Sequence, residues 1–110
     1  MRLILIHPTL HAFESNFNKI TIENLLRQSK EIISSNDVLL LPEHFTFDDD
    51  VYAYDDFIRF IARTSNCYVV GGSHHRIVNT KRINFGIVVD STGNEIGNYS
   101  KLRPYFNEKI

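Results

Sequence analysis

The sequence lacks the features that mark several broad classes of protein. It contains one cysteine, Cys67, among 110 residues, which excludes an internal disulfide framework and a cysteine-rich zinc site and favours a reduced, cytoplasmic location. Its longest apolar runs span four or five residues, too few for a membrane helix or a secretory signal. The net charge of −1 lacks the basic excess of general nucleic-acid binders. We therefore expect neither a membrane nor a nucleic acid as partner.

The composition is that of one small globular domain. Apolar residues make up 43% of the chain, which is ordinary for a folded protein. The charge is uneven, because residues 1–73 hold six basic and ten acidic groups, whereas residues 74–110 hold six basic and three acidic groups. Two interpretations stay open. The two parts are solvated faces that attract each other weakly, or the basic part forms a mouth that attracts an anionic substrate.

Short apolar runs separated by turn residues predict the strands. We expect buried strands at residues 3–6, 38–41 and 67–70, and two more strands at residues 83–90 and 95–100. The first three runs suit strands buried on both faces of a sheet. Residues 91–94 connect the last two strands as a hairpin turn. The stretch 73–82 is polar and is interpreted as a loop.

Apolar residues at spacings of three and four predict two helices. The first starts at Phe17, after Asn16 as N-cap, and its apolar stripe extends to Ile33. The second starts at the acidic residues 48–50 and ends at Asn66. The alternation of strands and helices predicts an α/β fold, with one partial sheet and two helices. Two helices are few for about five strands, so we expect an uncovered apolar face.

Glu43 is the strongest local candidate for chemistry. It follows the strand at 38–41 through Pro42, and ligands of open α/β sheets gather outside the carboxyl ends of strands. Partial desolvation beside Phe45 and Phe47 favours a carboxylate that works as a general base. The alternative is an exposed loop acid or a helix-capping group.

Other reactive side chains have weaker local signals. Lys101 ends the last expected strand and can offer a positive charge to an oxyanion, or it is a solvated surface lysine. Cys67 begins a strand and is interpreted as a small buried hydrophobe. His74 and His75 are adjacent, so in an extended chain their side chains point apart and do not bind one metal together. The acidic residues 48–50 are explained by a helix start.

Four stretches, in this order, resemble the carbon–nitrogen hydrolase (nitrilase) superfamily. They are the opening strand with residues 16–20, the segment 38–43 ending in Pro-Glu, the segment 69–73 followed by Asn84 and Gly93, and the segment 99–103. Each stretch alone is weakly specific, but the ordered set is more specific. The resemblance covers nearly all of the chain and only the first part of a family domain.

The resemblance implies a fold and a catalytic triad. The fold is a four-layer α-β-β-α sandwich, and the triad is Glu–Lys–Cys, which works without a metal or an organic cofactor. Glu43 matches the general base, Lys101 matches the lysine, and Glu108 is a candidate for the second glutamate of the family. Ser100 and Arg103 stand where the family usually has Arg and His. Cys67 precedes the lysine and does not match the nucleophile.

The implied function is hydrolysis of a non-peptide carbon–nitrogen bond in a small amide, nitrile or carbamoyl compound. We expect residues 1–110 to be the N-terminal part of a family domain, truncated before the nucleophile cysteine, inactive alone and homo-oligomeric. One alternative is a non-catalytic family member that binds a ligand or a partner. The other is an unrelated doubly wound α/β binding domain, which would need a glycine-rich turn after the first strand. Residues 7–10 contain no glycine.

Overall fold

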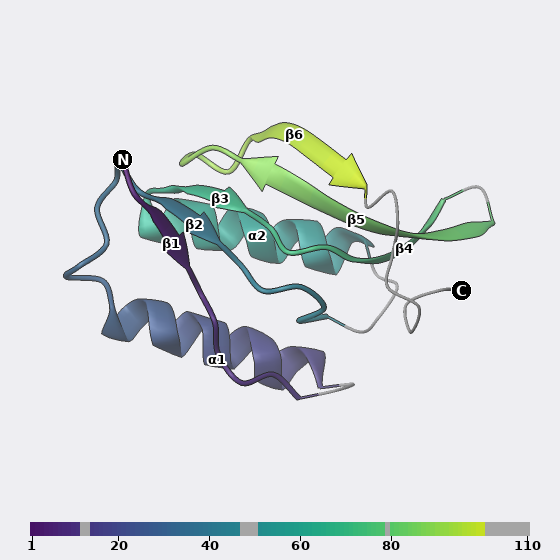
Figure 1. Cartoon of the computed structure of the whole chain (residues 1–110), viewed down its shortest axis with the longest axis horizontal. Coiled ribbons are helices and arrows are strands. Elements are labelled where there is room, and N and C mark those ends of the chain that lie inside the picture. The colour runs from purple at the N-terminus through teal and green to yellow at the C-terminus, as the bar shows by residue number, and fades with distance from the viewer. Residues whose placement is uncertain (12–13, 47–50, 79, 101–110) are drawn as a thin grey trace.

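The computed structural model describes residues 1–11, 14–46, 51–78 and 80–100. Its elements in chain order are β1 (Leu3–Leu5), α1 (Ser15–Gln28), β2 (Val38–Leu40), α2 (Val51–Ser65), β3 (Tyr68–Val70), β4 (His74–Val78), β5 (Lys81–Val89) and β6 (Glu95–Ser100) (Figure 1). The α/β class and the two predicted helices are confirmed. The sheet has six strands, one more than the sequence predicted.

The sheet is parallel in its first part and antiparallel in its second. Strands β1, β2 and β3 are parallel neighbours, and β5 runs antiparallel to β3, β4 and β6. Val70 pairs with Val88, and His74 pairs with Phe85, so β3 and β4 follow one another along the same side of β5. Because β6 is antiparallel to β5, it runs in the direction of β3. The carboxyl ends of β1, β2, β3 and β6 therefore point the same way.

Both helices cover the same face of the sheet (Figure 1). Their apolar stripes contact the inward side chains of the strands in one core. Its fully or nearly fully buried members are Ile22 and Leu26 of α1, Tyr54, Phe57, Ile58, Ile61 and Ala62 of α2, and Leu39, Val69, Ile87 and Val89 of the sheet. Burial of these side chains is the main force that holds the helices to the sheet.

The other face of the sheet is apolar at β1, β2 and β3, and no described helix covers it. Leu3 and Leu5 are 67% and 61% exposed, and Tyr68 is 45% exposed. Leu3 aligns through Val38 with Tyr68, and residues aligned across a sheet share a face. The prediction of burial on both faces is therefore wrong for β1 within the described residues, whereas the expected uncovered apolar face is confirmed.

The helix boundaries differ from the prediction. Helix α1 begins at Ser15, and the flanking Glu14 makes no side-chain capping bond, so the prediction of Asn16 as N-cap is wrong. The helix ends at Gln28, before the predicted Ile33. The reason is a turn in which the Ile32 amide donates to the Ser29 carbonyl. The acidic residues 48–50, predicted to start the second helix, lie outside the described residues.

The stretch predicted as a polar loop forms a hairpin instead. Strand β4 pairs with the first half of β5 in this stretch, from His74 opposite Phe85 to Val78 opposite Lys81. The hairpin turn predicted at 91–94 is confirmed. There Asp90 accepts hydrogen bonds from the Thr92 and Asn94 amides, and Gly93 has a φ of 89°, which glycine adopts without strain.

Candidate functional site

Glu43 lies where the chain leaves β2, beside the segment that joins β3 to β4. The Leu41 amide donates to the Val70 carbonyl at 3.0 Å, and the His44 amide donates to the Ser73 carbonyl at 2.9 Å. Glu43 is therefore flanked on both sides by backbone bonds to the neighbouring strand. A side chain at Gly72 would overlap the Pro42 carbonyl, so this close approach requires a glycine. The backbone position of Glu43 is tightly defined at the carboxyl edge of the sheet.

The Glu43 side chain is exposed. The Ser73 hydroxyl approaches its Oε1 with a long hydrogen bond of 3.4 Å. Burial, and second the charge of Glu43, raise the pKa of Tyr99. The predicted desolvation of Glu43 is wrong in the described residues. Phe45, which was expected to shield it, packs instead against the rings of α2 at 5.3 and 5.7 Å, and Phe47 lies outside the described residues.

Strand β6 leads the chain toward the same edge of the sheet. Ser100, its last residue, pairs with Phe85, and Phe85 pairs with His74 on its other side. Ser100 therefore lies two strands across the sheet from His74, the residue that follows Ser73, which contacts Glu43. The other predicted site residues, Lys101 and Glu108, follow Ser100 and lie outside the described residues, as does Arg103. Their predicted roles stay predictions.

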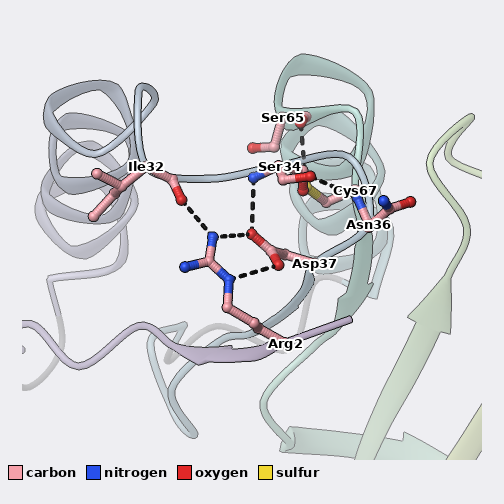
Figure 2. Close-up of polar contacts among 7 residues, drawn as sticks. All are labelled: Arg2, Ile32, Ser34, Asn36, Asp37, Ser65 and Cys67. Atoms are coloured by element: carbon pink, nitrogen blue, oxygen red, sulfur yellow. Dashed lines mark hydrogen bonds and ion pairs between the residues drawn. The ribbon is translucent and has the colours of Figure 1, made fainter.

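Cys67 lies at the opposite edge, at the amino end of β3 (Figure 2). Its side chain is fully buried, and Sγ lies 3.1 Å from the Ser34 carbonyl and 3.3 Å from the Ser65 carbonyl. Burial, and second the charge of Asp37, raise the pKa of the thiol. The prediction that Cys67 is buried is confirmed, and its position separates it from Glu43.

An ion pair that the sequence did not suggest holds this amino edge together (Figure 2). Arg2 donates to both carboxylate oxygens of Asp37, at 3.0 and 2.8 Å, and to the Ile32 carbonyl at 2.6 Å. Asp37 is buried, and the hydrogen bond from Arg2 is the main cause that lowers its pKa to about 2. This pair links the starts of β1 and β2, which fixes the register of the parallel strands.

A second cluster that sequence reasoning missed lies between α2 and the β4–β5 hairpin. Asp55 and Arg76 form a 2.8 Å ion pair that is mostly buried, and the guanidinium lies 4.2 Å from the centre of the Phe85 ring. His74 stacks on Tyr54 with ring centres 3.8 Å apart. The alternation of His74 and Arg76 with residues on the other face is a pattern typical of a strand. Because both side chains are polar, however, the sequence analysis did not assign them to the face of the strand that points to the core.

The paired histidines point to opposite faces, as predicted. His74 stacks on Tyr54 of α2, whereas the His75 ring meets His44 edge-on at 5.0 Å on the other face. Within the described ranges, no group of three or more His, Cys, Asp or Glu side chains could hold a metal ion. The described helices also include none that is long and apolar enough to cross a membrane.

Comparison with known proteins identifies the fold. No protein-family model matches the chain, and no curated protein sequence matches it. Among solved structures, an N-terminal amidase superposes on 96% of this chain with a TM-score of 0.79 and 18% identity. An amidase of the nitrilase superfamily from Nesterenkonia sp. AN1 superposes on 94% with a TM-score of 0.74 and 21% identity. The chain therefore has the carbon–nitrogen hydrolase fold.

The match covers only part of each solved structure. The chain spans 29% of the length of the N-terminal amidase and 44% of the length of the Nesterenkonia amidase. The N-terminal amidase has been solved with an Asn-Glu peptide, and the Nesterenkonia amidase has an active-site cysteine that reacts with acrylamide. The described residues of this chain thus correspond to one portion of an amidase fold.

Proposed function

We propose that this chain carries the base and the oxyanion-stabilising lysine of a carbon–nitrogen hydrolase. The substrate is a small molecule with an amide, nitrile or carbamoyl group. Glu43 is the general base, Lys101 stabilises the tetrahedral intermediate, and Glu108 is the second glutamate. The nucleophilic thiol comes from outside these 110 residues, since Cys67 is buried at the opposite edge of the sheet.

The chemistry divides the roles between these groups. Glu43 takes the proton of the attacking thiol, and the thiolate forms a bond to the carbonyl or nitrile carbon. The Lys101 ammonium stabilises the negative charge that develops on the oxygen or nitrogen of the attacked group. For an amide, collapse of the intermediate breaks the carbon–nitrogen bond, and the leaving amine takes a proton from the protonated Glu43. Water, activated by the same carboxylate, then hydrolyses the thioester.

One observation carries the proposal. Glu43 comes three residues after the end of β2, at the carboxyl edge to which β6 also leads, in a fold shared with two amidases. The exposed carboxylate is accessible to a substrate, and the backbone bonds on either side of it fix its origin. A general base must be held in a fixed position and must also be accessible to the group whose proton it takes.

Amide turnover by the gene product that carries these residues tests this role. We expect Glu43→Gln to lower kcat by about 10²- to 10⁴-fold, the usual contribution of a general base, with the fold retained. Glu31→Gln is the matched control, because Glu31 is an exposed acid in the turn after α1 and should leave kcat unchanged. Full turnover by the Glu43 variant would remove the proposal.

A second function is favoured by the uncovered apolar face around Leu3 and Leu5. A non-catalytic member of the fold could use that face to bind a ligand or a partner. The two functions differ in their dependence on a thiol. Turnover that a thiol-alkylating reagent abolishes, while Cys67→Ala preserves it, identifies the hydrolase, whereas thiol-independent binding without turnover identifies the binding protein.

A further inference from the structure

The segment Gly71–Gly72 receives a phenol hydrogen bond from each face of the sheet. Tyr54 of α2 donates to the Gly72 carbonyl at 2.6 Å, and Tyr99 of β6 donates to the Gly71 carbonyl at 2.6 Å. Tyr54 lies on the face covered by the helices. Tyr99 lies on the other face, because it aligns with Gly86, and its ring occupies the space above that glycine.

Neither glycine of this segment leaves room for a side chain. A Cβ at Gly71 would overlap the Tyr54 hydroxyl, and a Cβ at Gly72 would overlap the Pro42 carbonyl. Tyr54 is completely buried, and its oxygen also lies 3.4 Å from the Ile87 amide. The Gly71 amide donates to the Ile87 carbonyl at 2.9 Å. The segment is therefore held by a hydrogen bond on each face of the sheet and by a backbone bond to the neighbouring strand β5.

This segment in turn contacts the exit of β2. Gly72 packs directly against Pro42. Ser73, the next residue, is fully buried. Its carbonyl accepts a hydrogen bond from the His44 amide at 2.9 Å, and its hydroxyl donates to the Glu43 carboxylate at 3.4 Å. His44 has a φ of 57°, a conformation that non-glycine residues rarely keep without surrounding support. A shift of the Gly71–Gly72 segment would thus move the backbone that carries Glu43.

We infer that Tyr54 and Tyr99 are positioning residues that hold the Gly71–Gly72 segment against Pro42 and so fix the orientation of Glu43. The inference rests on the proposed function only for the role of Glu43 as base. Neither phenol is needed to transfer a proton in this scheme, since both hydroxyls already donate to carbonyl oxygens. Each acts through the backbone, one from the helix layer and one from the open face.

Hydrogen exchange in the 110-residue chain tests the inference without any turnover. Tyr54→Phe and Tyr99→Phe each remove one oxygen and keep the ring. We expect the His44 amide, which donates to the Ser73 carbonyl, to exchange about two- to tenfold faster in each variant. The Val38 amide, bonded to the Arg2 carbonyl at the opposite edge, should keep its rate. Matched controls are Tyr52→Phe on the exposed side of α2 and Tyr68→Phe on β3, which should change neither amide.

The pattern of exchange decides between positioning and general stability. An unchanged His44 rate in both variants, or an equal acceleration of His44 and Val38, overturns the inference, because the second pattern reports loosening of the whole fold. In the gene product, the account also predicts a lower kcat with an unchanged KM for both variants. If Glu43→Gln keeps full turnover, the proposed function fails, and the expected effect of the two tyrosine variants on kcat fails with it. Unchanged exchange together with an inactive Glu43 variant removes only the inference.

Discussion

At the scale of single residues, the structure separates the candidate base, Glu43, from the single cysteine of the sequence, Cys67. Glu43 is exposed at the carboxyl edge of the sheet, and Cys67 is buried at the amino edge. Both placements could be anticipated from the sequence, because Glu43 ends one apolar run and Cys67 begins another. The exposure of Glu43 could not be anticipated, because it depends on the packing of Phe45 against α2.

The burial of Cys67 predicts an unreactive thiol. Burial raises its pKa, so less thiolate is present at neutral pH, and the thiolate is the reactive form. We expect a thiol reagent to label the native chain far more slowly than the chain unfolded in urea, as followed by mass spectrometry. The unfolded chain is the control for intrinsic reactivity. Rapid labelling in the native state would contradict the structural role.

At the scale of elements, the sequence predicted the apolar strands and missed the polar one. The runs at β2 and β3 were recognised because their inward side chains are aliphatic. In β4 the inward positions are His74, which is buried, and Arg76, which is mostly buried. Both polar side chains can face inward because they contact Tyr54, Asp55 and Phe85. Those partners come from α2 and β5, so the local pattern alone could not show that these polar side chains face the core.

The contact between β4 and α2 predicts a pH-dependent stability. Burial is the main cause that lowers the pKa of His74 from 6.5 to about 4, and the charge of Arg76 is the second. As the pH falls, His74 therefore binds a proton at a higher pH in the unfolded chain than in the folded chain. The contribution of His74 to stability is complete above pH 6.5 and is lost as the pH falls toward 4. The slope is at most about 1.4 kcal/mol per pH unit.

Urea unfolding at several pH values measures this contribution. We expect His74→Phe, which keeps a ring against Tyr54, to have a shallower loss of stability between pH 6.5 and 4 than the unchanged chain. His7→Phe is the matched control, because His7 is exposed after β1 and should leave the slope as it is. Equal slopes for all three chains would show that His74 does not titrate in this contact.

At the scale of the whole molecule, two helices cover one face of a six-stranded sheet and the other face stays apolar. The four-layer sandwich implied by the family resemblance needs a second sheet on this face. Large exposed apolar patches are uncommon on monomers. The uncovered face was predicted from the sequence, because two helices are few for about five strands. The residues that line this face could be named only from the register of the strands in the structure.

The open face predicts association in solution. We expect the purified chain to scatter light as a species heavier than the 12.8 kDa monomer, and Leu3→Glu together with Leu5→Glu to shift it toward the monomer. Ile32→Glu is the control, because Ile32 is 69% exposed and belongs to the turn after α1 rather than to a strand of the sheet. A monomer at all concentrations would contradict the prediction.

The distance between Glu43 and Lys101 tests the proposed hydrolase site most directly. An experimental structure of the gene product that carries these residues would provide it. The account predicts that Nζ of Lys101 lies within about 6 Å of the Glu43 carboxylate, the range in which opposite charges stabilise each other. A separation well beyond about 10 Å, where salt screens the interaction, would contradict the site and most of the proposed function.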